Sequence, residues 1–387
     1  MKKYYLWLIK VFDVANPDLH EMMLRFGSPR EIYNAFRNNF AAAGADYAEK
    51  AARTTLEDAE KLISVLEGKG ITIITYDDEN YPENLKNTDN PPYVLFAKGN
   101  TELLNAKLLT IGGTRRVTEH TIASETAICE DLCQEYTFVA SLAAGCEQLA
   151  CLTAIKQGKG CIEVLPCGFD QEYPKGTQVM RQQILMNGGC LLSEFLPETR
   201  SSNANYLKRA RISGGISKAM IIFQAAANSG SLNAAKYSPA LFFLPPEDVF
   251  SDKYSAAVSG VRNGAKLYLS PNSLKSAYDE NYKPNHIRFE SQNRKRRTIR
   301  SDNDKPEEKT TAANENAVDK DIIQDMEFET ELHRFVYNMI AGSSEAVHFD
   351  EIYRNIDRDI PGTSEILLDL ESAGMITAVA GGRYMKV

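Results

Sequence analysis

From residue 71 to about residue 250, short apolar runs alternate with helical stretches, and this alternation restricts the possible folds more than any other feature of the chain. The first run, 71–76, is rich in β-branched residues and lies between Gly70 and two aspartates, a pattern typical of a strand. Helical stretches such as 123–135 separate most of the later runs. The pattern predicts a doubly wound α/β domain, in which helices cover both faces of a mostly parallel sheet. The later apolar runs lie at 108–111, 138–140, 161–165, 189–192, 219–223 and 240–244.

Different patterns precede and follow this region. Residues 1–70 carry apolar side chains at helical three-to-four spacing and predict a small all-helical domain. The predicted α/β domain follows it and covers 71–289. Residues 290–324 lose most hydrophobic side chains, a composition typical of a flexible, charged linker. Residues 325–387 predict three helices followed by a hairpin, which is the pattern of a winged helix. The expected helices are 328–339, 349–355 and 362–373, and the expected hairpin is 376–386.

The composition excludes several classes of protein. With 387 residues, 43% hydrophobic and 25% charged, the chain is neither fibrous nor wholly disordered. No window approaches the roughly 18 to 20 consecutive apolar residues that a membrane-spanning helix needs. The apolar run at the N-terminus is broken at Lys10, and no small-residue cleavage site follows it. We therefore expect a cytoplasmic protein with no membrane partner.

The formal net charge of −8 is distributed unevenly. Residues 290–300 carry 5 basic and 1 acidic side chains, whereas 301–387 carry 8 basic and 19 acidic ones. Between 76 and 289 the charges nearly cancel, so nucleic-acid binding there depends on local clusters of Lys and Arg. A domain that binds duplex DNA should be basic. We therefore expect the acidic C-terminal segment to bind a protein, or to bind the core of its own chain as a mimic of DNA.

The cysteines, histidines and known catalytic motifs point away from metal sites and catalysis. All seven cysteines lie between Cys129 and Cys190, which favours reduced core thiols over a disulfide scaffold. Paired CxxC spacing is missing and the five histidines are scattered, so we expect no metal. The GxxxxGK[ST], GxSxG and full GxGxxG motifs are absent, and we expect neither an enzyme nor a cofactor. The candidate acids, at no fixed spacing, are Glu147, Glu163, Asp170 and Glu194.

Four junctions between strands and helices carry residues suited to holding phosphates. In the first, 112–116, small residues let backbone amides approach an anion, and a hydroxyl and a guanidinium supply further donors. The carboxyl ends of parallel strands meet at one edge of a sheet, so the four loops predict one anion-binding crevice. The candidate residues are Gly112, Gly113, Thr114, Arg115 and Arg116 in the first loop, Ser141 and Gly145 in the second, Ser193 in the third, and Ser229, Gly230 and Ser231 in the fourth.

Basic residues lie beside aromatic ones in two further segments. Lys208, Arg209 and Arg211 follow Tyr206, and Lys175 follows a Tyr-Pro pair. A groove for single-stranded nucleic acid places cations at phosphates and aromatic rings at bases. Because the four loops accompany these segments, we interpret them as part of the same crevice rather than as a solvated basic face.

Together these segments resemble the DprA/Smf family of DNA-processing proteins. Residues 81–85 and 90–100 are similar to the opening of the family's domain, and 113–115 to its GTR phosphate-binding turn. Tyr173-Pro174, Ser193-Glu194 and 229–232 follow at the family's spacing, so the resemblance covers about 76–250. It implies a Rossmann-like domain, single-stranded DNA bound in a basic pocket, a homodimer, and transfer of the DNA to a RecA-type recombinase. The helical front, of SAM or helix-hairpin-helix type, and the winged helix fit longer members too.

The chain departs from the family pattern at several motifs. Where the family usually has SGLAxGIDxxAH, residues 140–151 place Glu147 and Cys151 at the Asp and His positions. The FPxRNR segment corresponds to 206–211, which keeps both arginines but loses the proline and the asparagine. The related lonely-guy hydrolases resemble PGGxGTxxE at the fourth loop, where this chain has no Glu, and hydrolysis is therefore disfavoured.

Three functions are compatible with the sequence. The first is a DprA-like protein that protects, senses or hands over single-stranded DNA in transformation or recombination. The alternative is a nucleotide- or DNA-sensing regulator that controls a partner effector protein in a phage-defence or toxin–antitoxin pair. The third is a nucleotide N-glycosidase, an interpretation that requires the protein to turn over a nucleoside monophosphate.

Overall fold

The computed structural model divides the chain into two compact units, Met1–Asn293 and Arg294–Val387, which are described separately. Within the first unit it describes residues 1–38 and 45–279. Within the second it describes 331–386 except 344–345, 357–362, 364–365, 368, 372, 374 and 380–382. The linker expected at 290–324 lies outside the described residues, and the bounds of the four expected segments stay predictions.

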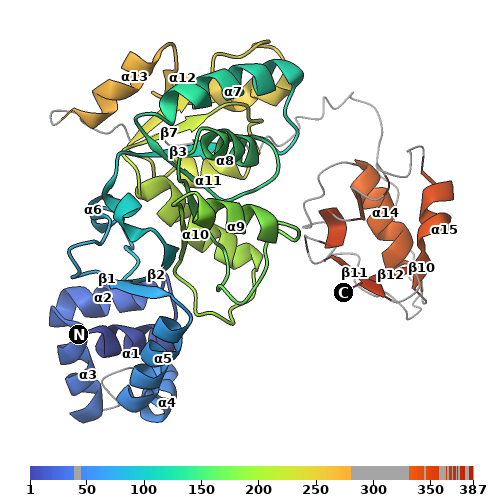
Figure 1. Ribbon diagram of the computed structural model, residues 1–387. Coiled ribbons are helices and arrows are strands. Elements are labelled where there is room, and N and C mark those ends of the chain that lie inside the picture. Colours follow the sequence, from blue (N-terminus) through green and yellow to red (C-terminus); the bar gives the residue numbers. More distant parts are fainter. Residues whose placement is uncertain are drawn as a thin grey trace, which may run out of the picture. The chain divides into compact units, whose positions relative to one another are not determined.

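A nine-stranded sheet forms the centre of the first unit (Figure 1). Its order is β1-β2-β6-β5-β4-β3-β7-β8-β9, and the neighbours from β6 to β9 pair in parallel. β1 and β2 add an antiparallel edge. The expected mostly parallel sheet is therefore confirmed, whereas β2 and β9 were not expected. The strands are β1 (Thr72–Thr75), β2 (Val94–Gly99), β3 (Leu108–Gly112), β4 (Thr137–Ala140), β5 (Ile162–Val164), β6 (Cys190–Ser193), β7 (Ala219–Ile222), β8 (Ala240–Phe243) and β9 (Lys266–Leu267).

The strand order reverses between β3 and β7. From β3 the chain moves outward through β4 and β5 to β6, and it then returns to place β7 on the other side of β3. In open α/β sheets, ligands bind outside the carboxyl ends of the strands at such a reversal. The loops after β3 and β7 therefore lie where the fold favours a binding site.

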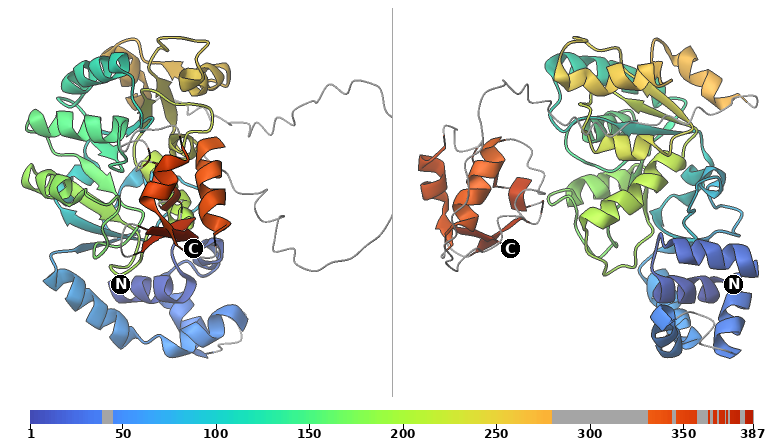
Figure 2. Two further views of the ribbon diagram at one scale, coloured as in Figure 1. Left: turned by 90° about the vertical axis from the view of Figure 1, so that its right-hand side faces the viewer. Right: turned by 180° about the vertical axis from the view of Figure 1, so that it is seen from behind.

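Helices cover both faces of the sheet (Figures 1 and 2). Side chains of a strand point alternately to the two faces, so Ile111 of β3 packs in the core with α7, α8 and α9, whereas Leu108 packs with α6 and α10. α11 and α12 cover the latter face at β7 and β8. Among the described residues, no helix is both long and apolar enough to cross a membrane. The helices that follow β1 in the first unit are α6 (Glu83–Lys86), α7 (Glu119–Leu132), α8 (Cys146–Lys156), α9 (Gln178–Met186), α10 (Asn203–Gly215), α11 (Ser231–Ala235), α12 (Ser255–Arg262) and α13 (Pro271–Lys275). Three short 3-10 helices accompany them, η2 (Thr101–Asn105), η3 (Asp252–Tyr254) and η4 (Ser276–Tyr278).

The N-terminal region is helical, as expected, and packs at the β1–β2 edge of the sheet (Figure 1). Its core surrounds Trp7 and includes Val94 and Phe96 of β2. Local capping defines the helix starts, because the Asn16 side chain accepts from Asp18 N at α2, and Thr55 forms a capping box at α5. The helices are α1 (Lys2–Phe12), α2 (Pro17–Phe26), α3 (Pro29–Asn38), α4 (Ala45–Arg53) and α5 (Leu56–Gly68).

The second unit combines helices with a small antiparallel sheet. Its elements are α14 (Glu331–Ala341), β10 (Val347–His348), α15 (Phe349–Arg354), β11 (Ile376–Val379) and β12 (Arg383–Lys386). The strand order is β10-β12-β11, and both pairings are antiparallel. α14 and α15 lie where the first two helices were expected, and β11 and β12 where the hairpin was expected. The third expected helix, 362–373, falls partly outside the described residues.

Candidate functional site

The loops after β3 and β4 touch through their backbones at the carboxyl edge of the sheet. A Cβ atom added to Gly113 would lie 2.4 Å from Cys146 Sγ, and one added to Gly145 would lie 2.2 Å from Thr114 O. Cys146 N, at the start of α8, donates to Thr114 O at 3.2 Å. Only glycine permits so close an approach. The structure therefore brings the first two candidate loops together.

Replacing Gly145 by Ala is expected to destabilise the protein by about 3 kcal/mol, because it adds overpacking against Thr114 O to backbone strain. Gly145 has a φ of 87°, which L side chains rarely adopt. The matched control is Gly158→Ala, where φ is 69° but an added Cβ would meet nothing within 4 Å. Urea unfolding should show the larger loss for the Gly145 variant. Equal losses would show that the close approach of the two loops contributes nothing.

The end of β7 holds the same turn from the other side. Gly113 N donates to Ser231 Oγ at 3.1 Å, and this hydroxyl donates back to Gly113 O at 2.8 Å. Thr114 N donates to the backbone oxygen of Gln224 at 2.6 Å. The amides of Gly113 and Thr114 are therefore engaged within the protein. Gly112 is buried at the end of β3, whereas the side chains of Arg115 and Arg116 are exposed.

A cluster of two tyrosines and two arginines lies beyond these loops. The Arg209 guanidinium lies over the Tyr206 ring, 4.9 Å from its centroid. The Tyr206 ring in turn meets the Tyr173 ring edge-on at 5.3 Å. Burial raises the pKa of Tyr173, and the charges of Arg115 and Arg209 act against this rise, so both cations lie near its hydroxyl. We call Arg115, Tyr173, Tyr206 and Arg209 the cation–tyrosine cluster.

Arg209 is the most buried cation of this cluster. Its Nε atom is inaccessible to solvent and has no hydrogen-bond partner. Burial lowers the pKa of Arg209, and the charges of Glu147 and Glu163 oppose that effect. A buried donor without an acceptor costs free energy, and an anionic ligand at this point would relieve that cost.

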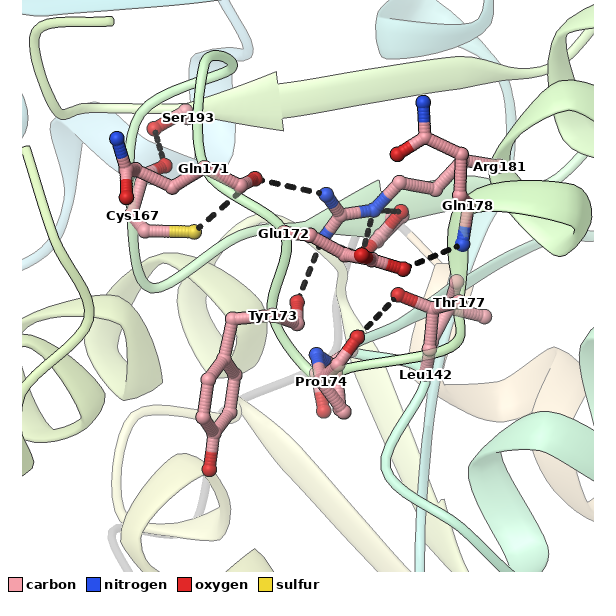
Figure 3. Close-up of polar contacts among 12 residues, drawn as sticks. Leu142, Cys167, Gln171, Glu172, Tyr173, Pro174, Thr177, Gln178, Arg181 and Ser193 are labelled. Atoms are coloured by element: carbon pink, nitrogen blue, oxygen red, sulfur yellow. Dashed lines mark hydrogen bonds and ion pairs between the residues drawn. The ribbon is translucent and has the colours of Figure 1, made fainter. Parts of the chain in front are cut away.

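A buried ion pair holds the loop that carries Tyr173 (Figure 3). Arg181 on α9 donates from Nε to both Glu163 oxygens at 3.0 Å, and from Nη2 to the backbone oxygen of Tyr173. It also donates from Nη1 to Gln171 O at 3.2 Å. The Tyr173 ring projects away from this ion pair. Burial raises the pKa of Glu163 to about 7, and the Arg181 charge works against this rise.

Arg181 was not among the predicted site residues, although the sequence contains a signal for such a residue. Glu163 is the one charged residue in the apolar run 161–165. A carboxylate buried within a strand needs a cationic or hydrogen-bonding partner, so a partner could have been anticipated. Its identity, 18 residues further along the chain, could not.

Arg211 and Lys208 are committed to partners within the protein. Arg211 Nη1 donates to Glu194 Oε2 at 2.9 Å, Nη2 donates to Glu194 Oε1, and Nε donates to Asn90 O at 2.8 Å. Both side chains of this ion pair are buried. Lys208 lies 3.3 Å from Asp13 of the helical region. These contacts give both residues a role in positioning α10.

The remaining candidates divide between the interior and the surface. Ser193 is buried and donates to Cys167 O at 2.8 Å, and Ser141 is buried and donates from N to Glu147 Oε2 at 2.6 Å. Lys175 and Gly230 are exposed, and Ser229 is half-buried. Of the remaining candidate acids, Asp170 pairs with Lys69.

The cysteines and acidic residues of the described chain form no metal site. All seven cysteines are buried and unpaired by disulfides. No group of three or more His, Cys, Asp or Glu side chains that could hold a metal ion occurs in the part of the chain that the structure describes.

Comparisons with known proteins show what the chain is similar to. Residues 72–279 match the family described as DNA recombination-mediator protein A. The chain is 28% identical over 219 residues to the DNA processing protein DprA of Bacillus subtilis, covering 55% of this chain and 73% of that protein. It is 30% identical over 215 residues to Protein Smf of Synechocystis sp., of which it spans about half, 54%. The crystal structure of DNA processing protein A from Streptococcus pneumoniae has a similar fold, with a TM-score of 0.60 and 22% identity, and the likeness covers 71% of this chain and 98% of that one.

Proposed function

The chain belongs to the DNA recombination-mediator protein A family, and on this premise we propose that it binds single-stranded DNA at the carboxyl edge of its sheet. The observation that carries the proposal is the cation–tyrosine cluster beside the β3–β7 reversal. Guanidinium groups hold phosphates, and tyrosine rings stack on bases of any sequence. Arg209 as a residue is half-buried, so part of its side chain is accessible to an anion, and its Nε lacks a partner within the protein.

The candidate residues have two proposed roles. Exposed residues, two half-buried hydroxyl residues at the loops, and Arg209 with its unpartnered Nε contact the DNA, and the residues fixed by close internal contacts position the loops. The proposed contact group is Thr114, Arg115, Arg116, Lys175, Arg209, Ser229 and Gly230. The proposed positioning group is Gly112, Gly113, Ser141, Gly145, Ser193, Lys208, Arg211 and Ser231.

The test is fluorescence anisotropy of a labelled oligo-dT with the wild type, Arg115→Ala and Arg209→Ala at several salt concentrations. We expect the wild type to prefer single strands over a duplex competitor, with an affinity that falls as salt rises. Each variant should bind roughly 10 to 100 times more weakly, and the log–log salt slope should fall by about one unit.

Arg53→Ala is the matched control, because this exposed arginine on α4 pairs only with Glu49 on the same helix among the ion pairs described here. It should bind as the wild type does. Failure of the wild type to bind any oligonucleotide would overturn the proposal. Mass spectrometry of the purified protein would then test the alternative of a bound nucleotide and a regulatory role with an effector protein.

We extend the proposal to the partners of the protein and to the compartment in which it acts. The protein acts in the cytoplasm as a homodimer, without catalysis or cofactor, and hands DNA to a RecA-type recombinase during recombination or transformation. The family membership of 72–279 supports these steps. Size-exclusion chromatography with light scattering tests the dimer, and strand exchange with a purified recombinase tests the transfer.

The second unit is proposed to be a winged-helix domain. Two helices and a three-stranded antiparallel sheet in the order β10-β12-β11 support this assignment. The 8 basic and 19 acidic side chains of 301–387 oppose binding to a duplex, so its proposed partner is a protein or the DNA-binding edge of its own chain.

A further inference from the structure

A carboxyl group is buried in the apolar face of α7, close to the candidate site. The buried residues of this helix are Thr121, Glu125, Cys129 and Leu132, and Glu125 is wholly inaccessible to solvent. Among the described residues, no nitrogen or oxygen atom pairs with the Glu125 carboxyl, and the Cys146 thiol, a weak donor, is its one hydrogen-bonding neighbour. Buried carboxyl groups normally have a hydrogen bond or a cation, so this one requires an explanation.

The groups that face Glu125 are neutral or negative. The Cys146 thiol and the Glu147 carboxylate act on it from α8, and the Cys129 thiol lies one turn along its own helix. The neighbouring β3 turn presents Gly113 and Thr114, which do not titrate. Burial raises the pKa of Glu125 to about 8; the hydrogen bond from the Cys146 thiol acts against this rise, and the charge of Glu147 adds slightly to it, so the carboxyl is mostly protonated at neutral pH.

Cys146 connects this carboxyl to the candidate site. Its thiol lies beside Glu125, its sulfur packs against the Cα atom of Gly113, and its backbone N donates to Thr114 O. Glu125 is therefore linked through Cys146 to the turn that carries Arg115. An ionised carboxylate at this depth repels an anion at the turn with little screening by solvent, whereas the neutral acid does not.

We propose that Glu125 is a proton-linked positioning residue, whose neutral form favours binding of a DNA phosphate at the β3 turn and whose ionised form opposes it. The inference rests on the proposed single-stranded DNA binding. Linkage is reciprocal, so bound DNA makes the Glu125 proton harder to remove, and binding above neutral pH takes up protons.

The test compares the wild type, Glu125→Gln and Glu130→Gln in binding a labelled oligo-dA between pH 6.5 and 9 at constant ionic strength. Neither adenine nor the phosphodiester titrates in this range. The wild-type Kd should rise above pH 7, approaching a tenfold increase per pH unit beyond pH 8. The Glu125→Gln profile should lose this rise and keep only the smaller pH dependence that Glu163, with a pKa of about 7, gives to all three proteins. Glu130 is exposed on the same helix, so its variant should follow the wild type.

The other outcomes distinguish a failure of the role of Glu125 from a failure of the proposed DNA binding. Parallel wild-type and Glu125→Gln profiles would overturn the role of Glu125 and leave the proposed DNA binding intact. Absence of binding by both proteins at every pH would overturn both. If circular dichroism shows that Glu125→Gln does not fold, calorimetry of the wild type at pH 8 in two buffers of different ionisation heat decides. Proton uptake on DNA binding supports the inference, and its absence overturns it.

Discussion

Replacing Arg211 by Met is expected to destabilise the fold by about 3–5 kcal/mol. The side chains of Arg211 and Glu194 are only 5% and 3% exposed, so the substitution leaves a carboxylate buried without its cation. It also removes the donor to Asn90 O, which ties α10 to the segment before β2. Urea unfolding at pH 7, followed by circular dichroism, measures the loss.

Two further variants isolate the ion pair. Arg211→Met/Glu194→Leu should recover most of the stability, because replacing both partners of a buried pair by apolar side chains is often nearly neutral. Lys69→Met breaks an ion pair with Asp170 that is close to half exposed, and it should change stability by less than about 1 kcal/mol. An unchanged urea midpoint for Arg211→Met would show that the pair does not hold α10 in place.

The contrast between Arg209 and Arg211 shows what spacing along a chain cannot predict. Residues two apart on a helix point in different directions, about 200° around its axis. Arg209 lies over Tyr206, three residues earlier, whereas Arg211 reaches Glu194 at the end of β6. Basic residues beside an aromatic predicted a DNA groove for both. Which of them faces the sheet depends on how α10 packs, and only the structure reveals that.

The fold was more predictable than the site because it follows from periodicity. Apolar runs separated by helical stretches were sufficient for the mostly parallel sheet, and seven of its nine strands coincide with expected runs. The other two strands, β2 and β9, were not predicted, and the reasons are physical. β2 follows a Pro-Pro pair without a preceding helical stretch of typical length, and β9 has only two residues, Lys266 and Leu267.

Contacts between distant segments account for what could not be predicted at the site. The four loops were expected to meet at one sheet edge, and the contacts of Gly145 with Thr114 and of Ser231 with Gly113 join three of them. That Gly113 N donates to Ser231 depends on a contact spanning 118 residues. Such pairings are set by tertiary packing and leave no local pattern in the sequence.

The buried acid Glu125 is expected to make stability fall as pH rises from about 5 to about 8. Its pKa is raised from 4.5 to about 8 in the folded protein, mainly by burial. Below pH 4.5 the carboxyl is neutral in both states. Between these values the unfolded chain releases the proton and the folded protein keeps it, so the free energy of unfolding falls by about 1.4 kcal/mol per pH unit. Above about pH 8 the contribution of this group is constant.

Urea unfolding of the wild type, Glu125→Gln and Glu130→Gln at pH 5, 6, 7, 8 and 9 measures this slope. Gln does not titrate, so the stability of Glu125→Gln relative to the wild type should increase with each pH unit and level off above pH 8. Glu163 has a pKa that is raised in the same direction, but it is common to all three proteins and cancels in the difference. The exposed Glu130→Gln control should run parallel to the wild type. If Glu125→Gln also runs parallel, then Glu125 is ionised in the folded protein at neutral pH, and the turn that carries Arg115 has a negative charge behind it.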